Sequence, residues 1–238
     1  MSVGQTIVIV GPTASGKTGV AIKLAKEIEQ RASQSIDGTF CGYRGAEVIS
    51  ADSRAIYRGM DIGTAKPSIE EQDGVVHWGI DLVDPGERFT VADWKRYAEE
   101  KITEIRARGN LPLIVGGTGL YVDALVYDYG FTEEGKRKQT DRESVCANYL
   151  IIGVKWELEK LRVRIAQRVD KLFVQELFDE TKKLVRLYKW DTQAMKSNIY
   201  QFAWAYLQDE MSLERAKELF VFDDWHLAKR QMTWFKRN

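Results

Sequence analysis

Residues 5–18 read Gln-Thr-Ile-Val-Ile-Val-Gly-Pro-Thr-Ala-Ser-Gly-Lys-Thr, and this stretch decides the fold. Its first six residues form an apolar, β-branched run with the length of one buried strand. The next eight match the phosphate-binding pattern G-x-x-x-x-G-K-[ST] in full. Apolar residues at helical spacing follow, namely Val20, Ala21, Leu24, Ala25 and Ile28. A strand, a glycine-rich turn and a helix in this order predict a P-loop.

The residue types of this loop suit a polyphosphate. Its glycines let consecutive backbone N–H groups surround phosphate oxygens, and the helix N-terminus adds partial positive charge. Lys17 supplies a cation, and the Thr18 hydroxyl is suited to Mg²⁺. The alternative is an ordinary glycine turn before a helix, which the complete motif and both flanks disfavour. The residues expected to contact phosphate are Gly11, Thr13, Ala14, Ser15, Gly16, Lys17 and Thr18.

Length and composition fit one domain over residues 1–238 with a sizeable core. Apolar residues make up 44% and charged residues 29%, as in globular proteins. Acidic and basic residues number 35 each, so a nucleic-acid partner would need local basic clusters. Neither a signal segment nor a membrane-length apolar run is evident, so we expect a cytoplasmic protein without a membrane partner. The two cysteines and two distant histidines lack metal-ligand spacing, so we expect no cysteine or histidine metal site.

Strands and helices alternate through the first 154 residues. We predict strands at 47–51, 75–81, 111–115 and 149–154, the last of them buried. Helices are predicted from Thr90, where Asp93 completes a capping box, to about 108 and again over 120–126. This order is typical of an α/β protein, with a parallel sheet that has helices on both faces.

Three other segments complete the prediction. Residues 56–67 contain glycines and a proline without a clear period, and we expect an ordered connection there. Residues 131–148 carry eight charges and few apolar side chains, which predicts an exposed segment between core parts 1–130 and 149–238. From residue 157 onward the pattern predicts three helices, at roughly 157–189, 192–208 and 212–236.

Ligands of open α/β sheets bind at the carboxyl ends of the strands, where this sequence places polar residues. Asp52, after the second predicted strand, is a candidate general base or Mg²⁺-linked carboxylate, with a helix cap as the alternative. Thr118 either contacts a substrate or caps the following helix. Arg168 lies at the edge of an apolar helical stripe, where it either reaches water or turns inward toward an anion.

The final predicted helix interleaves cations with aromatic residues, including Trp225, Lys229, Arg230 and Trp234. This mixture suits phosphate contact together with base stacking. A helix with a buried aromatic face and solvated lysines explains the same pattern nearly as well.

At these residues the chain resembles the tRNA dimethylallyltransferases, also called tRNA isopentenyltransferases. Four segments carry the resemblance: 11–18, 49–67, 115–121 and 227–235. The second segment is the most specific, because a P-loop by itself identifies only a superfamily. The likeness extends along the chain except at 31–45 and 131–148.

The resemblance implies a P-loop NTPase-like fold and transfer of a dimethylallyl group from dimethylallyl diphosphate to N6 of the adenosine 3′ of the anticodon. It implies that the P-loop and Arg168 bind the diphosphate, that Thr18 holds Mg²⁺, and that Asp52 is the general base. Thr18 and Arg168 are thereby expected to assist catalysis. The residues implied to contact tRNA are Asp52, Ser53, Arg54, Ala55, Thr118, Asp191, Lys196, Lys229, Arg230 and Gln231.

The chain also departs from this family. Bacterial members carry a helical insertion of several dozen residues where this sequence has only 130–148, so 131–148 is interpreted as its shortened remnant. Ala55 replaces a common Gln, residues 224–226 replace a Thr-Arg-Gln-like run, and Ile199 replaces a Gly. The alternatives are an adenine-nucleotide isopentenyltransferase, a P-loop small-molecule kinase and a nucleotide-dependent binding module. A monomer is expected.

Overall fold

Five parallel strands form the central sheet of the computed structural model, which describes residues 5–131, 137–138 and 148–237. The strands lie in the order β3-β2-β4-β1-β7. They are β1 (Thr6–Val10), β2 (Gly45–Ser50), β3 (His77–Trp78), β4 (Asn110–Gly116) and β7 (Tyr149–Gly153). The β-branched run of β1 is fully buried and pairs with β4 and β7, which explains its apolar character. The predicted P-loop-type α/β fold is confirmed.

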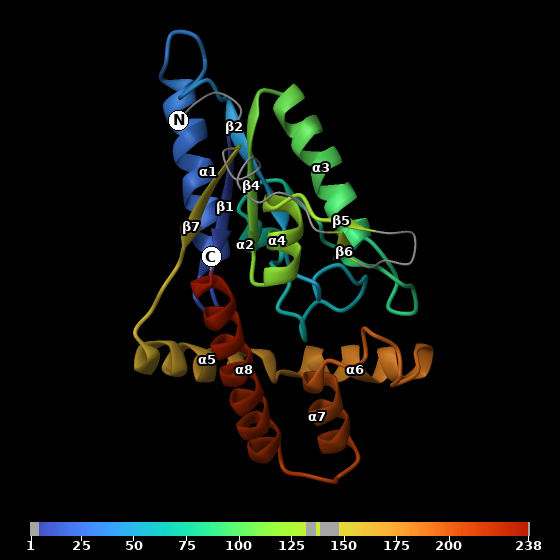
Figure 1. Ribbon diagram of the computed structural model, residues 1–238. Coiled ribbons are helices and arrows are strands. Elements are labelled where there is room, and N and C mark those ends of the chain that lie inside the picture. The colour runs from blue at the N-terminus through green and yellow to red at the C-terminus, as the bar shows by residue number, and fades with distance from the viewer. Residues whose placement is uncertain (1–4, 132–136, 139–147, 238) are drawn as a thin grey trace.

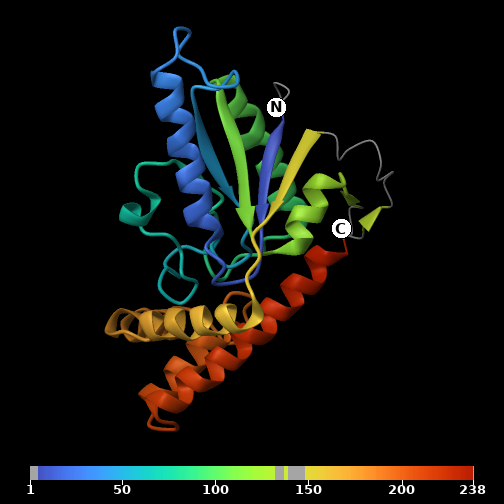
Figure 2. The ribbon, with the colours of Figure 1, turned by 90° about the vertical axis from the view of Figure 1, so that its left-hand side faces the viewer.

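Helices cover both faces of the sheet. Helix α1 (Lys17–Ser33) packs on one face, and α3 (Val91–Ala107) and α4 (Gly119–Val126) pack on the other (Figure 2). The Thr90 side chain accepts from the Asp93 amide and Asp93 caps the Thr90 amide, which confirms the capping box. Alternate residues of the strands point to opposite faces of the sheet, so they belong to two separate apolar clusters, one on each side.

A layer of four helices lies across the carboxyl ends of the strands (Figures 1 and 2). It consists of α5 (Leu158–Leu172), α6 (Gln175–Leu187), α7 (Asn198–Leu207) and α8 (Leu213–Lys236). A third apolar cluster joins this layer to the connection after β2, through Ile56, Tyr57 and Met60. The expectation that 56–67 is ordered is confirmed, since these buried side chains fix its beginning.

Short elements complete the fold. Helix α2 (Ile69–Gln72) precedes β3, and β5 (Gly130–Phe131) pairs antiparallel with β6 (Arg137–Lys138). The predicted exposed segment 131–148 falls mostly on residues 132–136 and 139–147, which lie outside the described part of the chain. No helix among the described residues is both long enough and apolar enough to cross a bilayer.

The single helix predicted over 157–189 is wrong, because α5 ends at Leu172 and α6 begins at Gln175. The apolar stripe of α5 ends at Leu172 and resumes at Leu177. A continuous helix would place its next core position at 175 or 176, where the chain has Gln and Glu. The helix predicted from residue 192 begins later, at Asn198, after a run of turns.

Two predicted strands also need correction. The strand expected over 75–81 is limited to His77–Trp78, because Gly79 adopts a φ of 79° that no extended strand contains. Strand β7 is not buried as predicted. It lies at the edge of the sheet, and Leu150, Ile151 and Ile152 are 37–44% exposed. An apolar run alone does not distinguish an edge strand from a central one.

Candidate active site

A cavity of about 850 Å³ opens where the strand ends face the C-terminal helices. The P-loop supplies one wall, and the segment that follows β2 supplies another. The turn after β4, together with side chains of α5 and α8, encloses the remaining sides. The cavity therefore lies at the carboxyl edge of the sheet, the position at which the sequence predicted a ligand site.

The P-loop forms the predicted strand–turn–helix geometry. Gly16 has a φ of 87°, a conformation that a side chain would strain, and α1 begins at the next residue. The Lys17 ammonium donates to the Pro12 carbonyl at 2.7 Å. Burial lowers the pKa of Lys17 to about 8; the nearby Asp52 carboxylate opposes this shift, and Arg168 adds to it. Lys17 is thus mostly charged at pH 7 and loses its charge as the pH rises through about 8.

Two side chains near the start of α5 hold the back of the P-loop. The Trp156 indole donates to the Ser15 carbonyl at 2.8 Å, and Arg164 Nε donates to the Ala14 carbonyl at 2.8 Å. The Arg164 guanidinium lies 4.5 Å from the centroid of the Trp156 ring. Neither residue was predicted from the sequence. The available signal was the spacing of Arg164 and Arg168, four residues apart on one helix face.

Arg168 turns inward and lines the cavity. Its Nη1 donates at 2.7 Å both to Thr13 Oγ1 and to the Asp224 carboxylate. Burial raises the pKa of Asp224, which is 5% exposed, although the Arg168 guanidinium counteracts this rise. The geometry excludes the alternative in which Arg168 extends into water. The pairing was not predicted from the sequence, because the two residues are 56 positions apart.

Asp52 lines the same cavity as the P-loop. Its Oδ1 accepts from the Arg54 backbone amide at 2.8 Å. The alternative of a helix cap is excluded, because turns follow Asp52 and the next helix is α2, which begins at Ile69. The carboxylate is therefore free of a capping role, and a general base or metal-linked role stays a prediction.

Thr118 does not cap the following helix, and its contact with a substrate stays a prediction. It precedes α4, yet its side chain makes no capping hydrogen bond. Its Oγ1 instead accepts from the Ser53 amide at 3.0 Å and lies 3.3 Å from Ser53 Oγ. Thr118 thus fixes the backbone next to Asp52, and both residues line the cavity.

Gln231 on α8 joins the two halves of the cavity wall. Its Oε1 accepts from the Thr13 amide at 2.7 Å, and its Nε2 donates to the Gly117 carbonyl at 3.0 Å. A Cβ at Gly117 would lie 2.4 Å from this Nε2, so a side chain there would displace the Gln231 amide. The Gln231 amide is thus engaged by the P-loop and by the turn after β4.

The remaining residues predicted to contact tRNA occupy different places. Lys196 and Arg230 are exposed and line the cavity, and Arg54 donates to the Gln193 carbonyl at 2.8 Å. Ala55 lines the cavity but is only 5% exposed. Lys229 is exposed and lies over the Trp225 ring at 5.2 Å. Asp191 is exposed and is not part of the cavity lining.

The donor atoms in the cavity suit a hard cation that is shared with phosphate. The Thr18 hydroxyl and the Asp52 carboxylate are oxygen donors in one cavity. Among the described residues, no group of three or more His, Cys, Asp or Glu could hold a metal by itself. Mg²⁺ commonly takes one or two protein ligands and completes its shell with substrate phosphates and water, so these residues fit that mode.

A family model described as IPP transferase matches residues 55–146 and 131–238. The chain belongs to the IPP transferase family. The two matched pieces meet at 131–146, within the segment that sequence analysis interpreted as a shortened insertion.

Relatives and solved structures agree with this membership. The tRNA dimethylallyltransferase of Acetivibrio thermocellus is 35% identical over 98% of this chain and 89% of its own length. That of Bacillus subtilis is 33% identical over 97% of this chain and 87% of its own length. The crystal structure of the tRNA isopentenylpyrophosphate transferase from Bacillus halodurans superposes with a TM-score of 0.80 at 33% identity, covering 99% of this chain and 88% of that one.

A eukaryotic dimethylallyltransferase acting on tRNA shares the fold at 21% identity, with a TM-score of 0.78. The match covers 97% of this chain and 69% of the eukaryotic one. The Acetivibrio comparison extends over 294 residues, whereas this chain has 238, so the relative has residues without counterparts here. The family resemblance found from the motifs is confirmed.

Proposed function

We propose that this protein is a tRNA prenyltransferase. It transfers the dimethylallyl group of dimethylallyl diphosphate to N6 of the adenosine 3′ of the anticodon and releases diphosphate. The bond from the allyl carbon to N6 forms as the bond from that carbon to the diphosphate oxygen breaks. The observation that carries the proposal is one cavity lined both by P-loop residues, namely Thr13, Ala14 and 16–18, and by Asp52, in a member of the IPP transferase family.

The P-loop would bind the diphosphate of the donor. Backbone amides of the loop and the N-terminus of α1 would surround its oxygens, while Lys17 and Arg168 supply positive charge. Thr18 would hold Mg²⁺, which when bound there would help to neutralise charge on the leaving group. These contacts strengthen as negative charge develops on the departing diphosphate, so they lower the barrier to transfer.

Asp52 would accept a hydrogen bond from the exocyclic amine of adenine and take up its proton. That amine is a poor nucleophile, so a carboxylate at this position assists its attack. Ser53 and Thr118 fix the Asp52 backbone through their mutual hydrogen bonds. The target base has to leave its stack to reach the allyl carbon, and extrusion costs least for a base that is not paired.

The tRNA would lie over the cavity mouth, where Lys196 and Arg230 are exposed, and would extend to Lys229, which stands beside Trp225 outside the cavity lining. Exposed cations there would contact phosphates, and the aromatic ring would offer a surface for stacking. Gln231 and Ala55 also line the cavity, and their contact with tRNA stays a prediction. Gln231 supports the P-loop through its amide, and Ala55 forms part of the buried floor.

One assay with separate acceptor arms tests this function. The protein is incubated with Mg²⁺ and dimethylallyl diphosphate, together with unmodified tRNA, with AMP, or with neither, and nucleosides are analysed by mass. A fourth arm supplies ATP in place of the prenyl donor. We expect prenylated adenosine only in the tRNA arm. Prenylated AMP would identify a free-nucleotide enzyme, and consumption of ATP with an untouched donor would identify a kinase.

A further inference from the structure

A single carboxylate on α6 accepts the backbone amides of three consecutive residues in the segment after β2. Glu180 Oε2 accepts from the Asp61 and Ile62 amides at 2.8 and 3.0 Å. Its Oε1 accepts from the Gly63 amide at 3.0 Å. Successive N–H groups that converge in this way form a concave site for an anion, and here the protein's own side chain fills it. The helical layer is thereby attached to one turn of the segment.

Tyr200 on α7 completes this attachment. Its hydroxyl donates to Glu180 Oε1 at 2.8 Å, and its side chain is fully buried. Burial, together with the Glu180 charge, raises the pKa of the Tyr200 hydroxyl, so it stays a donor. A Cβ at Gly63 would lie 2.5 Å from Tyr200 Cζ, so the ring packs directly against the glycine backbone. Helices α6 and α7 therefore hold the same turn together.

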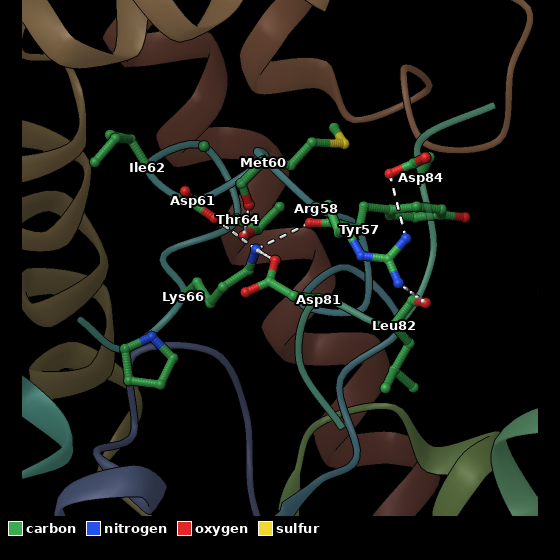
Figure 3. Close-up of polar contacts among 12 residues, drawn as sticks. Tyr57, Arg58, Met60, Asp61, Ile62, Thr64, Lys66, Asp81, Leu82 and Asp84 are labelled. Atoms are coloured by element: carbon green, nitrogen blue, oxygen red, sulfur yellow. Dashed lines mark hydrogen bonds and ion pairs between the residues drawn. The ribbon is translucent and has the colours of Figure 1, made fainter. Parts of the chain in front are cut away.

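Lys66 holds the same segment from within (Figure 3). Its ammonium contacts Asp61 Oδ1 and Asp81 Oδ1 at 2.6 Å each and donates to the Tyr57 carbonyl at 2.9 Å. The Lys66 side chain is only 5% exposed, which strengthens these contacts relative to surface ion pairs. The segment is thus fixed at both ends of the 61–66 turn.

This turn reaches the candidate active site although Glu180 does not. Residues 63–67 line the cavity that also contains the P-loop and Asp52, whereas Glu180 and Tyr200 are outside its lining. The buried residues Ile56 and Tyr57 connect this turn to Asp52 along the chain. Movement of the 61–66 turn would therefore displace one cavity wall and disturb the backbone that carries Asp52.

We propose that Glu180 and Tyr200 are positioning residues for prenyl transfer: they hold the 61–66 turn so that the acceptor adenine meets the donor in reacting geometry. This inference rests on the proposed function. The P-loop is held separately, by Trp156, Arg164 and Gln231. Loss of the Glu180 contacts therefore impairs turnover and leaves donor binding intact.

The test compares Glu180→Ala with Asp179→Ala, a control that removes an exposed carboxylate from the adjacent position of α6. Turnover with saturating tRNA and dimethylallyl diphosphate is measured beside the affinity for a non-hydrolysable donor analogue. We expect Glu180→Ala to lower kcat by about 100-fold, the scale of a reacting group displaced by about 1 Å. Donor affinity stays within about threefold, and the control behaves as wild type.

Two further variants separate positioning from stability. Tyr200→Phe keeps the ring against Gly63 and removes one O–H, and we expect it to lower kcat by several-fold with little change in thermal unfolding. Glu180→Gln keeps the side-chain volume but turns an NH₂ group toward amide donors, so its kcat falls between those of wild type and Glu180→Ala. Combined with Tyr200→Phe, it shows a non-additive effect on kcat.

Three results would overturn the inference. These are an unchanged kcat in folded Glu180→Ala and Tyr200→Phe, a loss of kcat that matches the unfolded fraction, or a donor affinity that falls as much as kcat. If the wild-type protein forms no prenylated tRNA, the proposed function itself fails. That outcome is distinct from an active wild type with equally active variants.

Discussion

The affinity for the prenyl donor should fall as pH rises through about 8, because Lys17 then loses its charge in the ligand-free protein. Burial sets the pKa of Lys17 at about 8, well below the 10.5 of an exposed lysine. A bound diphosphate restores the higher value by stabilising the ammonium, so binding above pH 8 takes up a proton. The charged lysine is the binding-competent form, and its population decreases tenfold for each pH unit above the pKa.

The magnitude follows from this pKa. Nine tenths of Lys17 is charged in the free protein at pH 7 and about one tenth at pH 9, so the apparent Kd rises roughly tenfold, or about 1.4 kcal/mol. Phosphate groups complete their own ionisation near pH 6, below this window. At pH 9 each bound donor therefore takes up about 0.9 proton.

Isothermal titration with a non-hydrolysable donor analogue, at fixed Mg²⁺, measures both quantities. Titrations from pH 7 to 9.5 give the affinity, and paired buffers with different ionisation enthalpies give the proton uptake. Lys17→Arg is the matched control, because arginine stays charged throughout and its affinity should not vary with pH in this range. A constant wild-type affinity from pH 7 to 9.5, or an equal slope in Lys17→Arg, would refute the reasoning.

Two other predictions concern buried charges. Arg168→Ala leaves the Asp224 carboxylate buried without its partner and should lower the free energy of unfolding by about 3–5 kcal/mol. Asp224→Asn should lower the free energy of unfolding by less, and it should strengthen donor binding because Arg168 is freed. Equal losses of unfolding free energy in urea for the two variants would argue against this pairing. Burial raises the pKa of Glu47, but hydrogen bonds from Arg108, Asn110 and Trp78 outweigh it and leave that pKa below its ordinary value. Glu47 therefore stabilises the fold above its unfolded pKa of about 4.3 and ceases to do so as pH falls through the lower folded value. Glu47→Gln should reduce stability at pH 7 by about 1–3 kcal/mol and abolish this pH dependence, and identical acid unfolding curves would contradict the assignment.

Local patterns predicted the half of the fold that contains the P-loop. A complete P-loop motif between a β-branched strand and an amphipathic helix leaves few alternatives, because each part needs the others to bury its apolar face. The capping box at Thr90 was equally local, since its partner Asp93 is three residues away. These features depend on sequence neighbours, so they are visible in a single sequence.

Long-range contacts explain what the patterns missed. The break between α5 and α6 has no glycine or proline to mark it, and only polar residues at 175 and 176 interrupt the stripe. The β7 run is as apolar as a central strand, yet its place in the sheet order leaves one edge open. Periodicity describes a segment alone, whereas burial depends on what packs against it.

In the candidate site, too, residues in local motifs were predicted and long-range partners were not. Asp52, Thr18 and Arg168 were found from motifs and resemblance, and all three line one cavity. Asp224, Arg164 and Glu180 were missed as structural partners, because each contacts backbone or side chains more than 50 positions away. Thr118 was found, but its contact with Ser53 required the structure.

Single-turnover prenyl transfer by Asp52→Asn tests the central claim most directly. Asparagine keeps an oxygen for the Arg54 amide, so the turn is preserved while the proton acceptor is lost. The enzyme is loaded with dimethylallyl diphosphate and Mg²⁺, mixed with an anticodon stem-loop RNA, and quenched at intervals. The account predicts a rate at least about 100-fold below wild type with unchanged donor affinity. A rate near that of wild type would contradict the assignment of Asp52 as the base.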